Sequence, residues 1–159
     1  MPPRRSQRPE PMEEKKKRPI LIGKTSAGKT TLCQCINHEA LKYHKTQTIQ
    51  LVNDRLIDTP GEYLERRSFW GALLVTAADA DVIMLIQDAT EDTSMFPPGY
   101  AGQFPKPVVG VVTKCDLVSA KQIENAKEYL EIAGVKNIFP LSSVTGEGVG
   151  ELIRYLDIL

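Results

Sequence analysis

The sequence has little that would suit a membrane or secreted protein. None of its apolar runs reaches the roughly 18 residues that a bilayer span needs, so we expect no transmembrane segment. Its three cysteines, Cys33, Cys35 and Cys115, are too few for a disulfide framework. With no secretory signal ahead of them, we expect reduced thiols in a cytosol. Cys33 and Cys35 lie two positions apart on a predicted helix and do not share a face, so we do not expect them to bind a metal.

The chain also has no net charge, but its charges are unevenly placed. Residues 1–18 hold seven Lys or Arg against three Glu, which gives this segment a charge of +4 and leaves −4 on the remaining chain. A mildly acidic body argues against a nucleic-acid partner, although the basic segment alone could touch an anionic one.

The basic segment is short of apolar side chains as well. Its only large ones are Met1 and Met12, too few to bury the surface that folding requires, so we expect a disordered tail at residues 1–18. A plain solvated tail and a protein that begins at Met12 are both left open. The remaining residues, 19–159, suffice for one domain with a sizeable core.

What the remaining sequence does contain is a regular alternation of short apolar runs and helical patterns. The apolar runs predict strands at residues 19–22, 48–52, 54–58, 82–86, 108–112 and 138–141. Helical patterns fall at residues 29–37, 62–79, 119–133 and 148–158. Such alternation predicts a three-layer α/β domain, with a mostly parallel sheet and helices on both faces.

Two of the helices carry further signals. In 62–79 an i, i+3, i+4, i+7 pattern predicts one buried face, made of Trp70, Leu73, Leu74 and Ala77. In 119–133, Ser119 is suited to cap the first turn and Gly134 follows the last one.

One connection has no helical pattern. Residues 90–106, TEDTSMFPPGYAGQFPK, join two predicted strands and hold three prolines and two glycines. We expect a stiff loop with a short helical turn. The alternative is a partner surface, because Phe96, Tyr100 and Phe104 are spaced four apart.

The most specific motif is GKTSAGKT at residues 23–30, which fits G-x-x-x-x-G-K-[ST] between a strand and a helix. Successive backbone N–H groups there form a nest for phosphate at a helix N-terminus. We expect Lys29 to reach the β and γ phosphates and Thr30 to offer its hydroxyl to Mg²⁺. The predicted nucleotide-binding residues in this segment are Gly23, Ser26, Ala27, Gly28, Lys29, Thr30 and Thr31.

Three later stretches also follow predicted strands. In LIDTPGEY, Asp58 is placed to hold Mg²⁺ through water and the Gly61 N–H to meet a γ-phosphate. In TKCD, Asp116 can accept two hydrogen bonds from guanine, which adenine cannot supply. In SSVTG, backbone N–H groups can meet the guanine oxygen. The predicted base-binding residues are Thr113, Lys114, Asp116, Ser142, Ser143 and Val144.

In the order of these four motifs the chain resembles the small GTPases, over about residues 19–159. The phrases GKTSAGKTTL, ALKYHKTQT, IDTPGEYLE and VVTKCDL look more closely like the propanediol/ethanolamine-utilisation family of small P-loop proteins (PduV/EutP), with the propanediol branch nearer. That resemblance implies a P-loop, GTPase-like fold and a cytoplasmic bacterial protein associated with the protein shells of microcompartments.

The chain departs from the GTPase pattern in several places. Glu62 stands where active GTPases often have a glutamine that orients water. An ionised carboxylate cannot donate a hydrogen bond, so we predict slow hydrolysis with Lys29, Gly61 and Glu62 as the catalytic set. Thr46, or else Thr48, would supply a second hydroxyl to Mg²⁺.

Other departures leave the base open. Thr113 replaces the usual Asn and Val144 the usual Ala, so both GTP and ATP remain candidates. Three hypotheses follow: a GTP-binding switch that hydrolyses slowly, a P-loop phosphotransferase acting on a small carboxylate, and a nucleotide-stabilised adaptor that docks to shell proteins.

Overall fold

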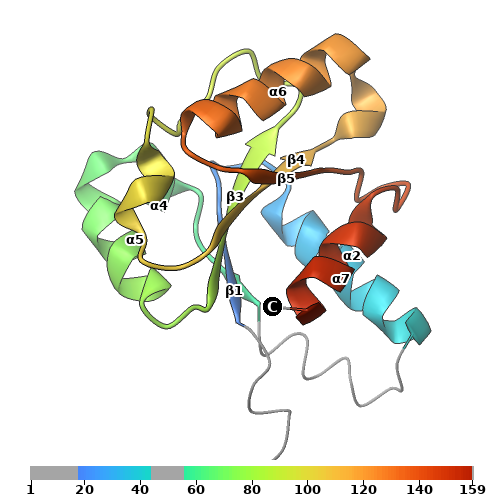
Figure 1. Cartoon of the computed structure of the whole chain (residues 1–159), viewed down its shortest axis with the longest axis horizontal. Helices are drawn as coiled ribbons and strands as arrows, with labels where there is room; N and C mark the ends of the chain where they lie inside the picture. Colours follow the sequence, from blue (N-terminus) through green and yellow to red (C-terminus); the bar gives the residue numbers. More distant parts are fainter. Residues whose placement is uncertain (1–17, 44–55, 159) are drawn as a thin grey trace, which may run out of the picture.

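The computed structural model describes residues 18–43 and 56–158, and in this part of the chain five strands form one parallel sheet. The strand order is β2-β1-β3-β4-β5 (Figure 1). The strands are β1 (Pro19–Ile22), β2 (Ile57–Asp58), β3 (Val82–Asp88), β4 (Val108–Thr113) and β5 (Asn137–Pro140). The predicted strand at 48–52 and the first two residues of the one at 54–58 lie outside the described residues, and β2 forms the end of the latter.

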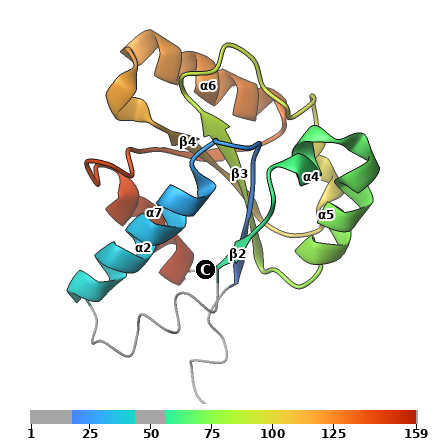
Figure 2. The ribbon, with the colours of Figure 1, turned by 180° about the vertical axis from the view of Figure 1, so that it is seen from behind.

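Helices cover both faces of the sheet, so the predicted three-layer α/β architecture is confirmed (Figures 1 and 2). One face carries α2 (Lys29–Tyr43) and α7 (Val149–Ile158), and the other carries α4 (Glu62–Glu65), α5 (Trp70–Ala77) and α6 (Ala120–Ile132). The central strands β1 and β3 are buried along their whole length because both of their faces are covered. No helix in the described part of the chain is long and apolar enough to cross a membrane.

The predicted caps of α6 are confirmed. The Ser119 hydroxyl accepts a hydrogen bond from the Gln122 N–H at 3.3 Å, and the Gln122 side chain accepts the Ser119 N–H in return. This reciprocal pair is a capping box. Gly134, just past the helix, has the left-handed φ of +101° that a C-terminal glycine commonly adopts.

The helix expected over 62–79 is wrong as a continuous element. The chain forms the single turn α4, passes through Arg66 in an extended conformation, makes a 3-10 turn η2 (Arg67–Phe69), and only then enters α5. The expected buried face also needs correction, because Leu74 is 42% exposed whereas Leu73 and Ala77 are buried. The helix expected at 29–37 extends to Tyr43.

Between β3 and β4 the chain makes the predicted loop, with one 3-10 turn η3 (Tyr100–Gln103). Its aromatic residues Phe96, Tyr100 and Phe104 are buried in the core. Tyr100 lies at the centre of the cluster, with ring centroids 5.4 Å from Trp70, 5.5 Å from Phe96 and 5.6 Å from Phe104. The fourfold spacing therefore serves packing, and these rings do not form an exposed partner surface.

Candidate functional site

The loop between β1 and α2 is built to curl. Ser26 and Gly28 both have positive φ, of 69° and 103°, which turns successive peptide units to one side. At the start of the loop, a Cβ on Gly23 would lie 3.0 Å from both the Cβ and the carbonyl oxygen of Ile86, so a side chain there would force β3 to give way by a few tenths of an ångström. The motif predicted from the sequence thus forms a tight concave loop that opens helix α2.

Lys29 lies inside this loop. Its side chain is only 6% exposed, and its Nζ donates hydrogen bonds to the carbonyl oxygens of Gly23 at 2.8 Å and Lys24 at 3.0 Å. Burial lowers the pKa of Lys29 from its usual value, against the opposing effect of the carboxylates of Asp58 and Glu65. The loop therefore holds a desolvated cation at its centre, where an anion would interact strongly with it.

Thr30 and Asp58 lie side by side. The Thr30 hydroxyl, in the first turn of α2, donates to Asp58 Oδ2 at 3.2 Å, and Asp58 ends the neighbouring strand β2. A hydroxyl and a carboxylate are the oxygen ligands by which Mg²⁺ is bound next to phosphates, so these two residues fit that ion. Thr46 and Thr48, the candidates for a second hydroxyl, lie outside the described residues. Within the described chain no group of three or more His, Cys, Asp or Glu side chains gathers as a metal cluster.

Thr113 and Lys114, at the end of β4, hold the loop in place. Thr113 is buried, and its hydroxyl donates to the Ala27 carbonyl oxygen at 2.7 Å. The Lys114 ammonium donates to the Ser26 carbonyl oxygen and to Asp88 Oδ2, both at 2.8 Å. The Thr113 hydroxyl and the Lys114 ammonium thus both bond to carbonyl oxygens of the loop of residues 23–30, and Lys114 also bonds to Asp88.

Asp88 was not identified from the sequence. It ends β3, is 5% exposed, and accepts hydrogen bonds from the Thr90 N–H at 2.8 Å and the Thr90 hydroxyl at 2.6 Å as well as from Lys114. Burial raises the pKa of Asp88, but these bonds to its charged form outweigh burial and leave the pKa below its ordinary value. The available signal was a carboxylate that follows the apolar run 82–86 after one glutamine.

Asp116 and Ser142 meet across the ends of β4 and β5. The Ser142 hydroxyl donates to Asp116 Oδ1 at 2.8 Å and accepts the Thr145 N–H at 3.1 Å. The bond leaves the second oxygen of the exposed carboxylate available and fixes its direction. The side chain of Val144 is 81% exposed, so at this position the backbone is the polar feature.

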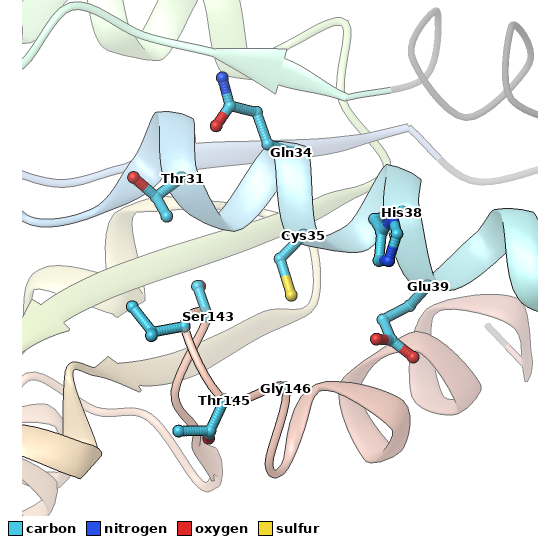
Figure 3. Close-up of a pocket in the computed structure, with 9 residues that line it drawn as sticks. Thr31, Gln34, Cys35, His38, Glu39, Ser143, Thr145 and Gly146 are labelled. Atoms are coloured by element: carbon cyan, nitrogen blue, oxygen red, sulfur yellow. The ribbon is translucent and has the colours of Figure 1, made fainter.

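Two cavities lie along the candidate site. One cavity of 220 Å³ lies over the phosphate loop, and another of 360 Å³ lies between α2 and the loop after β5. Figure 3 shows the second cavity, with Cys35 pointing from α2 toward the loop of Ser143 and Thr145. Thr31 lines both cavities, so they adjoin at this residue, and the two together are called the groove.

The segment after β2 packs on the phosphate loop. A Cβ on Gly61 would lie only 2.2 Å from the Thr25 nitrogen, so only glycine fits there. Glu65, one turn later, accepts the Thr25 N–H on its Oε2 at 2.6 Å. Thr25 lies within the predicted loop of residues 23–30, but neither it nor Glu65 was singled out from the sequence, although Glu65 falls one helical turn beyond the predicted Gly61. Glu62, predicted as catalytic, lies exposed in the same turn.

Comparison with protein families places the chain clearly. A family model described as "Ethanolamine utilisation - propanediol utilisation" (PduV-EutP) matches residues 16–158. The chain is 44% identical over 141 residues to the propanediol utilization protein PduV of Citrobacter freundii, covering 89% of this chain and 93% of that protein. It is 30% identical over 141 residues to the probable acetate kinase EutP of Escherichia coli strain K12, covering 88% of this chain and 89% of that protein.

Solved structures agree in architecture. The FeoB G-domain from Methanococcus jannaschii matches with a TM-score of 0.62 at 21% identity, over 90% of this chain and 96% of that one. The elongation factor SelB from Methanococcus maripaludis, solved with the GTP analogue GPPNHP, also has a TM-score of 0.62 at 21% identity, over 89% of this chain and 33% of that one. The fold is thus the P-loop, GTPase-like one that the sequence predicted.

Proposed function

The chain belongs to the ethanolamine and propanediol utilisation family (PduV-EutP), and from this premise we propose that it binds GTP with Mg²⁺ and hydrolyses it slowly. The observation that carries the proposal is the groove itself. One of its cavities is lined by the buried Lys29. The other is lined by Ser143, which follows the Ser142 that bonds to the Asp116 carboxylate. A nucleotide has the matching arrangement of a charged phosphate chain and a hydrogen-bonding base.

The phosphates would lie in the loop of residues 23–30. Its N–H groups and the N-terminus of α2 favour anions, and Lys29 supplies a full charge that burial makes effective. Thr31, which lines both cavities, lies between phosphates and base. Gly61, packed on Thr25, stands at the loop end where its N–H would meet a γ-phosphate.

Thr30 and Asp58 would hold Mg²⁺, and Thr46 is proposed as a third oxygen ligand. When bound, the ion neutralises charge on the β and γ phosphates. The protein's own contribution is to orient the two oxygens, and the 3.2 Å hydrogen bond between Thr30 and Asp58 already brings them together.

The base would lie against the Asp116 and Ser142 pair. Because Ser142 occupies one carboxylate oxygen, the other is directed at donors of the base. Guanine offers donors there and adenine does not, and an unpaired carboxylate is costly to bury, so we expect preference for GTP. The backbone N–H groups of Ser143 and Val144 would complete recognition of the guanine oxygen.

The test is affinity for labelled GTP and ATP in the presence of Mg²⁺. We expect a GTP preference that collapses in Asp116→Ala and persists in Asp79→Ala, a change at an exposed carboxylate away from the groove. Lys29→Ala should abolish binding of both nucleotides, whereas Lys121→Ala on the exposed side of α6 should not. Equal affinity for GTP and ATP in all variants would reject guanine recognition.

Slow hydrolysis follows from Glu62. An ionised side chain at this position cannot donate to the attacking water and repels the γ-phosphate. We expect Glu62→Gln to raise the single-turnover rate without tightening GDP binding. A wild-type rate as high as in Glu62→Gln would contradict the assignment.

A second candidate function is phosphoryl transfer to a small carboxylate. The relatives that favour it are the probable acetate kinases EutP of Escherichia coli and Salmonella typhimurium, each 30% identical to this chain. Glu62 suits it too, because an enzyme that passes phosphate to an acceptor should not activate water. Nucleotide turnover that rises on addition of acetate or propionate would favour this function over the first.

The cellular setting is proposed from the family. Membership implies work in the bacterial cytoplasm, alongside the microcompartments in which propanediol or ethanolamine is degraded. If the chain is instead a nucleotide-stabilised adaptor, purified shell proteins should bind it equally with no nucleotide, with GDP and with a GTP analogue. Binding that depends on the nucleotide would favour the switch.

A further inference from the structure

One contact at the phosphate loop has no part in the function proposed above. The carboxylate of Glu65 accepts the backbone N–H of Thr25 at 2.6 Å. Thr25 belongs to the loop of residues 23–30, whose N–H groups are the donors that phosphate oxygens would take up. An anion supplied by the protein thus occupies one donor of an anion-binding loop.

The turn that carries Glu65 is firmly anchored. Leu64 is 2% exposed in the core, and the indole N–H of Trp70 donates to the Leu64 carbonyl oxygen at 2.8 Å. Gly61, at the start of the turn, packs on the backbone of Thr25 so closely that no Cβ fits between them. Glu65 is therefore presented to the loop by a fixed turn, although its own side chain is exposed.

The charges around Glu65 are those that would also act on a terminal phosphate. Hydrogen bonds from the N–H and the side chain of Thr25 lower the pKa of Glu65, burial partly opposes them, and the charges of Lys24 and Lys29 lower it further. The carboxylate is thus ionised at neutral pH and within electrostatic range of the ammonium proposed to contact the β and γ phosphates. Two anions cannot share this position without repulsion.

The position of Glu65 along the loop decides which phosphate it opposes. Its segment is also that of Gly61, the residue proposed to meet the γ-phosphate. Gly61 packs on the backbone of Thr25, and Glu65 accepts the N–H of that same residue. The carboxylate consequently stands at the γ end of the phosphate chain.

We propose that Glu65 is the residue by which this chain distinguishes a nucleoside triphosphate from a diphosphate. This inference rests on the proposed function and adds to it the residue that sets the preference between nucleoside diphosphate and triphosphate. A diphosphate leaves the contact between Glu65 and Thr25 intact. A triphosphate must displace the carboxylate, and α4 moves with it, so wild-type affinity favours the diphosphate.

The experiment measures affinities of the full chain for GDP and for a non-hydrolysable GTP analogue, with Mg²⁺. In Glu65→Gln we expect the analogue to bind about tenfold more tightly, on the scale of one hydrogen bond to a charged group, with GDP changed much less. Glu128→Gln, which removes an equivalent charge from the exposed side of α6, should leave both affinities as in wild type.

A second readout follows the turn directly. Trp70 is the single tryptophan of the chain and donates to Leu64, next to Glu65. Its fluorescence should change when the GTP analogue is added to wild type and stay nearly constant with GDP. In Glu65→Gln the difference between the two nucleotides should shrink.

The possible results distinguish a failure of the role of Glu65 from a failure of the proposed function. If wild type binds both nucleotides and Glu65→Gln leaves their affinity ratio unchanged, the role of Glu65 is rejected while the proposed function stands. If wild type binds neither nucleotide, both are rejected. A shifted ratio in Glu65→Gln alone supports the assignment.

Discussion

At the scale of single residues, the candidate site depends on polar side chains that tie the ends of β3 and β4 to the phosphate loop. Thr113 bonds to Ala27, and Lys114 joins Ser26 to Asp88. The short Thr113 side chain reaches the Ala27 carbonyl oxygen directly, so it supports the loop from the end of β4.

Asp88 gives a prediction about pH. It is buried and its charged form accepts three hydrogen bonds, so Asp88→Asn should lower the free energy of unfolding by about 1–3 kcal/mol at neutral pH. Because the folded pKa lies below the ordinary 3.8, this contribution is complete above that value and is lost as the pH falls through the lower folded pKa. Urea unfolding at pH 6 and at pH values below 4 would measure it.

The matched control is Asp79→Asn, which changes an exposed carboxylate. It should follow wild type at every pH. A difference between Asp88→Asn and wild type that is the same at pH 6 and in acid would contradict the charged state assigned to Asp88.

The sequence motifs predicted some residues of the candidate site and did not indicate others, and the reason is physical. Lys29, Thr30 and Gly61 belong to contiguous motifs whose backbone geometry is local, so the sequence indicates them directly. Asp88 and Glu65 matter through partners 26 and 40 residues away. Such pairs depend on strand register and on where a turn ends, which no local pattern specifies.

At the scale of elements, the clearest failure is the helix predicted over 62–79. Its apolar spacing is genuinely helical in α5, but the chain leaves the helical conformation at Arg66, whose φ and ψ are −113° and 121°. The break lets α4 turn toward the phosphate loop while α5 packs on the sheet. The apolar periodicity reports how α5 packs on the sheet. It carries no information about α4, which contacts the phosphate loop through Glu65.

For helix α6, by contrast, local sequence signals were enough to predict the residues that cap its two ends. Removing its capping hydroxyl in Ser119→Ala should cost about 1 kcal/mol in the free energy of unfolding, because the Gln122 N–H loses its acceptor. Chemical denaturation compares this variant with wild type.

Ser119→Asp is the control, since aspartate caps helices about as well as serine. It should retain most of the wild-type stability. If Ser119→Ala were as stable as wild type, the capping box would have no energetic role.

At the scale of the whole molecule, the parallel sheet explains why motifs far apart in sequence meet. The phosphate loop, Asp58, Asp88, Lys114 and Ser142 all lie at or just beyond the carboxyl ends of their strands. In a parallel sheet these ends share one edge, and there ligands bind in open α/β folds. The order of the motifs therefore predicted that these residues would lie together at one edge of the sheet, but it did not predict their individual contacts.

A ligand that joins these strand ends should stabilise the entire chain. At 100 times its Kd, a ligand that binds only the folded state adds about 2.7 kcal/mol, which for a domain of this size raises Tm by about 5–10 °C. We expect that rise with GTP and Mg²⁺, followed by thermal unfolding, and a smaller one when EDTA removes the metal. Lys29→Ala should show no rise, and Lys121→Ala should show the full rise. A Tm unmoved by GTP, ATP or GDP in wild type would contradict the nucleotide site, because binding that leaves folding stability unchanged is excluded by mass action.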